Sequence, residues 1–245
     1  MFVHGWAMNA AVWDSCNEHL PDWIDAVCVD LPGHGGMHHL TAESLDEMVM
    51  MVAAVTSKPA VWVGWSLGGL VCQRLAVLYP EKVRALYLVA SSPKFVRSPD
   101  WETAMSLEVF DQFAELFSQN IQKTIRRFIA LQLMGSDEAR EVMQKLDRAM
   151  SLQGLPDEAS LALGLDLLRH TDLRDSLMRI ECPTGWLLGG GDMLVPEAFA
   201  AALPKLMPQA DIDIVDGAGH APFLSHPAEF STRLSAFVQS RAIAR

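Results

Sequence analysis

Three residues that together can perform nucleophilic catalysis lie in glycine-containing segments far apart in the sequence. Ser66 lies in GWSLG, Asp192 in GGGDMLVP and His220 in GAGHAPF. A serine hydroxyl is a weak nucleophile unless a base takes its proton as it attacks. We expect His220 to be that base, and Asp192 to hold the imidazole in the correct tautomer and to stabilise the imidazolium.

The glycines beside Ser66 suit a sharp turn from a strand into a helix. Such a turn strains the backbone of the serine, and side chains two residues to either side would collide. Gly64 and Gly68 remove those side chains, and the start of a helix at Leu67 directs N–H groups toward the hydroxyl. We therefore expect a nucleophile elbow rather than an ordinary turn.

Ester cleavage by a serine also needs two donors for the oxyanion that forms in the transition state. The elbow supplies one donor, the backbone N–H of Leu67. The segment HGWAMN follows the first apolar run, and there we expect the backbone N–H of Trp6 to be the second. We expect His4 to brace this loop.

Strand-like and helix-like patterns alternate through the first part of the chain, which is typical of βαβ units and a parallel sheet. Ser44 and Glu47 predict a capping box at the start of one helix. Each reactive residue follows a predicted strand, and ligands bind at the carboxyl ends of the strands in such sheets. The expected strands are residues 2–4, 26–29, 60–64, 85–89, 184–188 and 212–215, and the expected helices are residues 10–20, 45–55, 67–78, 196–206 and 227–238.

Between residues 94 and 180 the strand patterns disappear and apolar residues recur at helical spacing, as at Phe110, Phe113 and Phe117. We expect a helical lid of residues 94–180, inserted into a core of residues 1–93 and 181–245. The order Ser, Asp, His predicts an α/β-hydrolase fold, with a mostly parallel sheet flanked by helices. The chain opens almost directly on the strand before HGW, so we expect the N-terminal β-hairpin of such hydrolases to be missing.

Composition excludes several classes of function. Half of the 245 residues are hydrophobic and the formal net charge is −11, which predicts a globular protein without affinity for nucleic acid or anionic membranes. No signal peptide or membrane-spanning stretch is evident. The four cysteines form no C-x-x-C pair, so we expect buried free thiols and a cytoplasmic location.

Other roles for the acidic residues and histidines remain open. Asp192 could cap the helix that begins near residue 196, and Asp216 is a competing acid although it lies only a few residues from His220. His34, His38 and His39 lack the carboxylate or cysteine partners of a metal site. We expect these three histidines to be solvated surface residues and no metal to bind.

Basic residues gather in the insertion. The segment 119–135 carries Lys123, Arg126 and Arg127 and no acidic residue. Lys123 and Arg127 are four residues apart and share a helix face. Both a solvated surface and a docking patch for an acidic partner fit this pattern.

The chain resembles the α/β hydrolases that cleave the methyl ester of pimeloyl-acyl carrier protein in biotin synthesis. The likeness runs from FVHGWAMNAAVW and VGWSLGGLV through FIALQLMG and HTDLR to GDMLVP and GHAPFLSHPAEF, and so covers nearly the whole chain. It implies that Ser66, Asp192 and His220 are catalytic and that Trp6 and Leu67 form the oxyanion hole.

The same resemblance implies a substrate slot and a partner, with no metal or organic cofactor. Trp6, Trp65, Leu67 and Phe128 match the positions of the slot for the pimeloyl chain. Lys123, Arg127 and Arg140 match basic residues that hold the acidic carrier protein. Lys123 and Gln144 stand where the family pattern favours arginine, and lysine lacks the bidentate fork of arginine.

The residues alone leave three other functions open. One is a carboxylesterase or lactonase that acts on free short-chain esters. Another is a hydrolase of carbon–carbon bonds, which uses a similar triad. The third is a catalytically silent binding protein that uses the pocket as a receptor.

Overall fold

A parallel sheet forms the centre of the computed structural model, which describes residues 1–134 and 136–243. Residue 135 of the expected lid and residues 244–245 of the expected core therefore lie outside it. Within the described residues the sheet has six strands in the order β2-β1-β3-β4-β5-β6. The strands are β1 (Phe2–Val3), β2 (Cys28–Val29), β3 (Ala60–Trp65), β4 (Val83–Val89), β5 (Thr184–Gly189) and β6 (Asp211–Val215).

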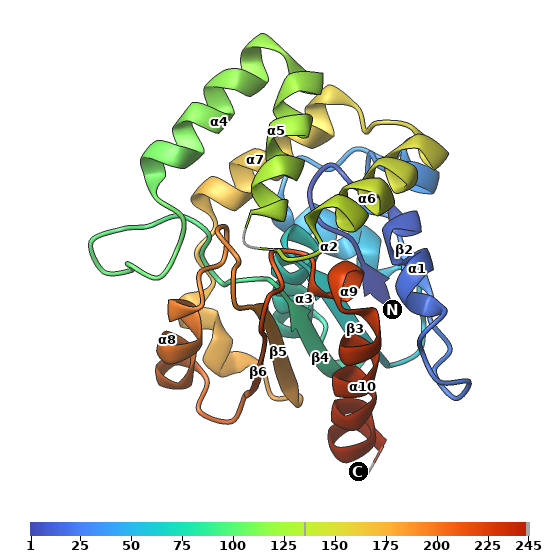
Figure 1. The fold of residues 1–245 in the computed structure, drawn as a ribbon. Coiled ribbons are helices and arrows are strands. Elements are labelled where there is room, and N and C mark those ends of the chain that lie inside the picture. Colours follow the sequence, from blue (N-terminus) through green and yellow to red (C-terminus); the bar gives the residue numbers. More distant parts are fainter. Residues whose placement is uncertain (135, 244–245) are drawn as a thin grey trace.

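Helices flank the sheet, as the sequence predicts, with α10 in front of the strands in Figure 1 and α3 packed against β3 and β4. The helices outside the insertion are α1 (Asp14–Asn17), α2 (Leu45–Ala53), α3 (Leu67–Leu78), α8 (Ala198–Leu206), α9 (Pro222–Ser225) and α10 (Pro227–Phe237). Short helical turns are η1 (Ala10–Trp13), η2 (Gly35–Met37), η3 (Pro80–Lys82) and η4 (Arg174–Arg179), and a π-helical turn, η5 (Val238–Ile243), follows α10.

Among the described residues, four α-helices between β4 and β5 gather above the carboxyl ends of the strands (Figure 1). We call them the cap helices: α4 (Leu107–Gln119), α5 (Ile121–Leu133), α6 (Ala139–Gln153) and α7 (Glu158–His170). Two of them begin at side-chain caps, because Ser106 accepts from the N–H of Val109 and Asp157 accepts from the N–H of Ser160. The cap helices therefore cover the edge at which the sequence places the reactive residues.

Ion pairs join the segments that leave and re-enter the core beside the cap helices. Arg174 bonds to Asp172 at 2.7 Å and to Asp100 at 2.8 Å. Lys94 bonds to Asp172 at 3.0 Å, and the N–H of Leu173 donates to the carbonyl of Pro93. The two ends of the insertion are thus fastened to each other.

The predicted elements agree with the structure except for one helix. The strand predictions match within two residues, and Ser44 caps α2 by accepting from the N–H of Glu47 at 3.2 Å. The carboxylate of Glu47 accepts from the N–H of Glu43 rather than from that of Ser44. The helix expected over residues 10–20 is wrong in extent: a 3-10 turn precedes the single turn of α1, which ends at Asn17, ahead of Pro21, where a helix loses a backbone donor.

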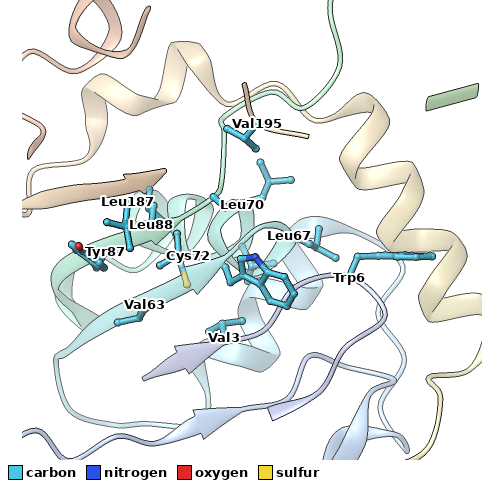
Figure 2. Close-up of a cluster of buried hydrophobic side chains, with 14 of the residues drawn as sticks. Val3, Trp6, Val63, Leu67, Leu70, Cys72, Tyr87, Leu88, Leu187 and Val195 are labelled. Carbon is cyan, nitrogen blue, oxygen red and sulfur yellow. The ribbon is translucent and has the colours of Figure 1, made fainter. Parts of the chain in front are cut away.

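Buried apolar side chains fill the sheet from strand to strand. Figure 2 shows Val3, Val63, Leu88 and Leu187 on neighbouring strands, and each is at most 1% exposed. Both faces of β3 and β5 are covered, which is why these strands read as continuous apolar runs rather than as alternating patterns.

Two observations concern the surface and the cysteines. In the described part of the chain, no helix combines the length and the apolar character needed to cross a bilayer. All four cysteines are free, and Cys16 and Cys72 are buried as expected. Cys28, in β2, and Cys182 are only partly buried, so the expectation of a buried thiol is not met in full at these two positions.

Candidate active site

Ser66 occupies a strained turn between β3 and α3. Its φ of 53° and ψ of −118° place a residue that has a side chain in a conformation that favours glycine. A Cβ at Gly64 would lie 2.6 Å from the carbonyl oxygen of Gly68, so only glycine fits there. The hydroxyl of Ser91 donates to the carbonyl of Ser66 at 2.8 Å and so stabilises the turn.

The structure brings the three predicted reactive residues together in one hydrogen-bonded line. Ser66 Oγ lies 2.8 Å from His220 Nε2, and His220 Nδ1 lies 2.8 Å from Asp192 Oδ2. All three side chains are buried, with residue exposures of 2%, 0% and 4% in that order. Nδ1–H donates to the carboxylate, which leaves Nε2 free to accept the proton of the serine.

Asp192 both orients the histidine and caps the chain that follows it. Its Oδ1 atom accepts from the N–H groups of Leu194 and Val195 at 2.8 and 3.0 Å, while Oδ2 faces the imidazole. The capping interpretation and the catalytic interpretation therefore both describe this residue. Asp216, the competing acid, is exposed and makes no bond to His220 within the described residues.

The backbone of His220 is held from two sides. Its N–H donates to the carbonyl of Gln132 in α5 at 3.1 Å, and its carbonyl accepts from the indole N–H of Trp65 at 2.7 Å. Sequence reasoning missed both bonds, because neither a backbone acceptor nor the direction of an indole leaves a signal in the pattern. The cap helices and the elbow thus fix the position of the base.

The loop after β1 contains Trp6, whose backbone N–H is the expected second oxyanion donor. No hydrogen bond from the backbone N–H of Trp6 or of Leu67 to another group occurs in the described structure, so both donors are available. His4 braces the loop as expected: its Nε2 accepts from the N–H of Leu31 at 2.9 Å, and its Nδ1–H donates to the carbonyl of Gly5 at 2.8 Å.

A narrow apolar cavity of about 20 Å³ lies beside Ser66. Apart from the serine its walls are apolar side chains, most of them from the cap helices. Sequence reasoning assigned only Phe128 to this wall. The remaining residues are Phe95, Met105, Phe110, Phe113, Leu165, Leu168 and Leu194. The apolar stripes of α4 and α7 could have indicated some of them, but Phe95 and Met105 lie in irregular segments that carry no such pattern.

Trp6, Trp65 and Leu67, the other expected slot residues, are not on the wall of this cavity. Trp65 turns toward His220, and its ring contacts Phe223 at a centroid distance of 5.1 Å. The ring of Trp6 packs edge-on against Phe128 at 4.9 Å. Figure 2 shows Trp6 extending away from the sheet, with Leu67 between it and the strands.

The three histidines of the segment 34–39 differ in burial. His38 and His39 are exposed as expected, but the expectation is wrong for His34, which is 1% exposed and contacts the ring of His4 at 5.1 Å. Burial, with a smaller contribution from His34, lowers the pKa of His4 well below its usual range, and burial lowers the pKa of His34 as well. Among the described residues no cluster of three or more His, Cys, Asp or Glu could hold a metal ion.

The predicted basic residues lie on the outer faces of two adjacent cap helices. Lys123 and Arg127 are exposed on α5, and Arg140 is exposed on α6. Within the described part of the chain none of the three forms a salt bridge. Their charges are therefore exposed, and they lie on two of the cap helices.

Comparisons with known proteins match nearly the whole chain. A model of the alpha/beta hydrolase family matches residues 1–233. A pimeloyl-[acyl-carrier protein] methyl ester esterase of Xylella fastidiosa (strain 9a5c) is 41% identical over 241 residues, covering 97% of this chain and 94% of the relative. The esterase of the same name from Photobacterium profundum is 39% identical over 239 residues, covering 98% and 94%.

Solved structures share the fold at lower identity. An esterase from Exiguobacterium antarcticum superposes with a TM-score of 0.83 at 19% identity and covers 97% of this chain and 91% of its own. A hydrolase from Oleispira antarctica superposes with a TM-score of 0.86 at 16% identity and covers 98% and 90%. At these identities the likeness concerns the fold alone.

Proposed function

The chain belongs to the alpha/beta hydrolase family and, within it, to the group of pimeloyl-[acyl-carrier protein] methyl ester esterases, and we propose that it hydrolyses the methyl ester of a pimeloyl chain carried by acyl carrier protein. The observation that carries this proposal is the line of Ser66, His220 and Asp192 beside an apolar cavity. The relatives' shared name supplies the substrate.

In the proposed mechanism Ser66 Oγ attacks the ester carbonyl while His220 Nε2 takes its proton. The oxyanion forms against the N–H groups of Trp6 and Leu67, and losing one such donor typically costs about 3–4 kcal/mol of transition-state stabilisation. His220 then gives the proton to the departing methoxide. A water molecule, deprotonated by the same histidine, hydrolyses the acyl-enzyme.

The lining of the cavity suits the methylene groups of the acyl chain, although the cavity itself is smaller than that chain. Its wall is apolar, and burial of each CH₂ group contributes about 0.8 kcal/mol. We propose that the cap helices belong to a lid domain of residues 94–180, set on a core of residues 1–93 and 181–245, and that the lid encloses this chain.

We propose that Lys123, Arg127 and Arg140 hold the acidic carrier. The net charge of −11 repels an acidic partner as a whole, so a local basic face is needed to steer it. The three residues are exposed and without salt bridges in the described structure, which leaves them available for contacts with acidic side chains.

The experiment compares the carrier-linked methyl ester with a free methyl ester of the same chain. We expect Ser66→Ala to remove turnover of both esters and of p-nitrophenyl esters, with the protein still folded. We expect Arg127→Glu and Arg140→Glu to lower kcat/KM for the carrier-linked ester and to leave the free ester unchanged.

Other outcomes identify the rival functions. Retained activity of Ser66→Ala contradicts the serine mechanism. Equal kcat/KM values for the two esters in the wild-type protein favour a carboxylesterase or lactonase that acts on free short-chain esters. Failure on all esters, with turnover of a vinylogous diketone, favours carbon–carbon bond hydrolysis, and no reaction of Ser66 with a fluorophosphonate favours a binding protein.

A further inference from the structure

The loop after β1 is tied to the cap helices on both sides of a strained residue. The indole N–H of Trp6 donates to the carbonyl of Leu161 in α7 at 2.9 Å. The side-chain amide of Asn9 donates to the carbonyl of Ala149 in α6, also at 2.9 Å. Between them Ala7 has a φ of 61°, which is costly for a residue with a side chain and persists only where the surroundings hold it.

Asn9 also forms a hydrogen bond with the turn that follows the same loop. Its Oδ1 atom accepts from the N–H of Ala11 at 3.0 Å and so caps the turn η1. The neighbouring N–H of Ala10 donates to Asp30 at 2.6 Å. Asn9 is 2% exposed, so protein partners rather than bulk water satisfy its amide. One side chain thus bridges the loop and the cap helix α6.

Asn9 has no direct route to the substrate. It is not among the residues that line the cavity beside Ser66. It lies three positions after Trp6, whose backbone N–H is the proposed oxyanion donor. Any effect of Asn9 on the reaction has to pass through the backbone of this loop.

We propose that Asn9 is a positioning residue that aligns the Trp6 N–H with the oxyanion only while α6 is seated on η1. The inference rests on the proposed function, because it concerns the oxyanion hole of that reaction. If α6 moves outward, Asn9 loses its acceptor and the strained backbone at Ala7 loses part of its support. Arg140, a proposed contact for the carrier, lies on the same helix, so docking on α6 and alignment of the hole are coupled.

Two substitutions separate the bridge from the cap of η1. Asn9→Asp and Asn9→Ser both keep an oxygen that can cap the turn, and both lack the amide donor to Ala149. We expect kcat for p-nitrophenyl butyrate to fall by about 10- to 100-fold, less than the loss of a whole donor, with KM within about two-fold.

A second readout reports on the oxyanion hole itself. When a trifluoromethyl ketone binds, Ser66 Oγ adds to its carbonyl carbon and the serine proton passes to His220. The resulting oxyanion lies in the oxyanion hole. We expect the inhibition constant of the ketone to rise by the same factor as kcat falls, because both measure stabilisation of that oxyanion. A residue that only supports folding would lower the melting temperature and leave this constant unchanged.

The matched control removes a different bond from the same helix. Lys145 in α6 donates to the carbonyl of Leu224 at 2.8 Å and pairs with Glu141 at 2.7 Å, and neither bond involves the loop after β1. We expect Lys145→Met to lower the melting temperature and to leave kcat and the inhibition constant at wild-type values, because the bond from Asn9 to Ala149 still seats α6 on η1.

The outcomes distinguish the inference from the proposed function. Folded Asn9 variants with wild-type kcat and inhibition constant, or an equal loss in Lys145→Met, overturn the positioning role alone. A wild-type protein that neither turns over esters nor binds the ketone overturns the proposed function instead.

Discussion

The indole N–H of Trp65, the residue before the nucleophile, donates to the carbonyl of His220 at 2.7 Å. The elbow therefore positions the base as well as the serine. We expect Trp65→Phe to leave a buried carbonyl without its donor, at a cost of about 1–3 kcal/mol in unfolding free energy. We also expect it to lower kcat by about 10-fold or more, because the imidazole is no longer held in place.

Trp62 offers the matched control for that change. It lies on the same strand, and its indole N–H donates to the carbonyl of Lys82 at 3.0 Å rather than to His220. We expect Trp62→Phe to lower stability without changing kcat. Urea unfolding and steady-state kinetics measure the two effects, and an equal fall of kcat in both variants would show that general loosening is the cause.

Replacement of the orienting acid tests the tautomer of the histidine. In Asp192→Asn we expect the amide oxygen to keep accepting hydrogen bonds from the N–H groups of Leu194 and Val195. The NH₂ group then faces His220 Nδ1. The imidazole then carries its proton on Nε2 and cannot accept from Ser66. We expect kcat to fall by about 10⁴-fold with the fold intact. Stopped-flow and steady-state assays give kcat, and circular dichroism checks the fold.

The glycine after the elbow has no room for a side chain. A Cβ at Gly68 would overlap the backbone carbonyl oxygens of Val3 and His4, which a change of rotamer cannot relieve. We expect Gly68→Ala to destabilise the protein by about 1–3 kcal/mol and to lower kcat, because the elbow and the loop after β1 are forced apart.

Gly36 is the control for the added methyl group. A Cβ there meets only the carboxylate of Asp30, at the ordinary contact distance of 3.5 Å. We expect Gly36→Ala to unfold at the wild-type temperature. Differential scanning calorimetry of both variants decides the matter, and a wild-type melting temperature for Gly68→Ala would contradict the steric explanation of the motif.

The ion pairs at the ends of the insertion predict a pH dependence of stability. Partial burial raises the pKa of Asp172, but hydrogen bonds from Arg174 and Lys94 outweigh it and lower the pKa to about 2. The folded pKa is thus below the unfolded value, so the stabilisation is present above about pH 4 and is lost as the pH falls toward 2. After allowance for solvent screening it amounts to about 1 kcal/mol.

Asp172→Asn checks this contribution. We expect the variant to be less stable than the wild type at pH 7 and the difference to shrink steadily between pH 4 and pH 2. Urea unfolding across that range measures it. A difference that stays constant with pH would assign the effect to packing rather than to ionisation.

Much of the site is readable from the sequence because its requirements are local. The strained turn at Ser66 needs glycines at fixed positions beside it and a buried strand and a helix on either side. Because all of these are neighbours in the sequence, the turn can be predicted from local residues. The helix cap at Ser44 is readable for the same reason, since donor and acceptor lie three residues apart. The helix expected over residues 10–20 shows the limit, because its apolar spacing is interrupted by local turns.

Through-space contacts are the part that only the tertiary structure decides. Four features depend on segments that are far apart in the sequence and share no local pattern. They are the choice of Asp192 over Asp216, the burial of His34, the turn of Trp65 toward His220 and the bridge from Asn9 to α6. The residue types that can do chemistry, and the turn that presents the serine, follow from the sequence alone. Their distances, the wall of the cavity and the ties to the cap helices follow from packing, because side-chain directions are set by whichever distant surface covers them.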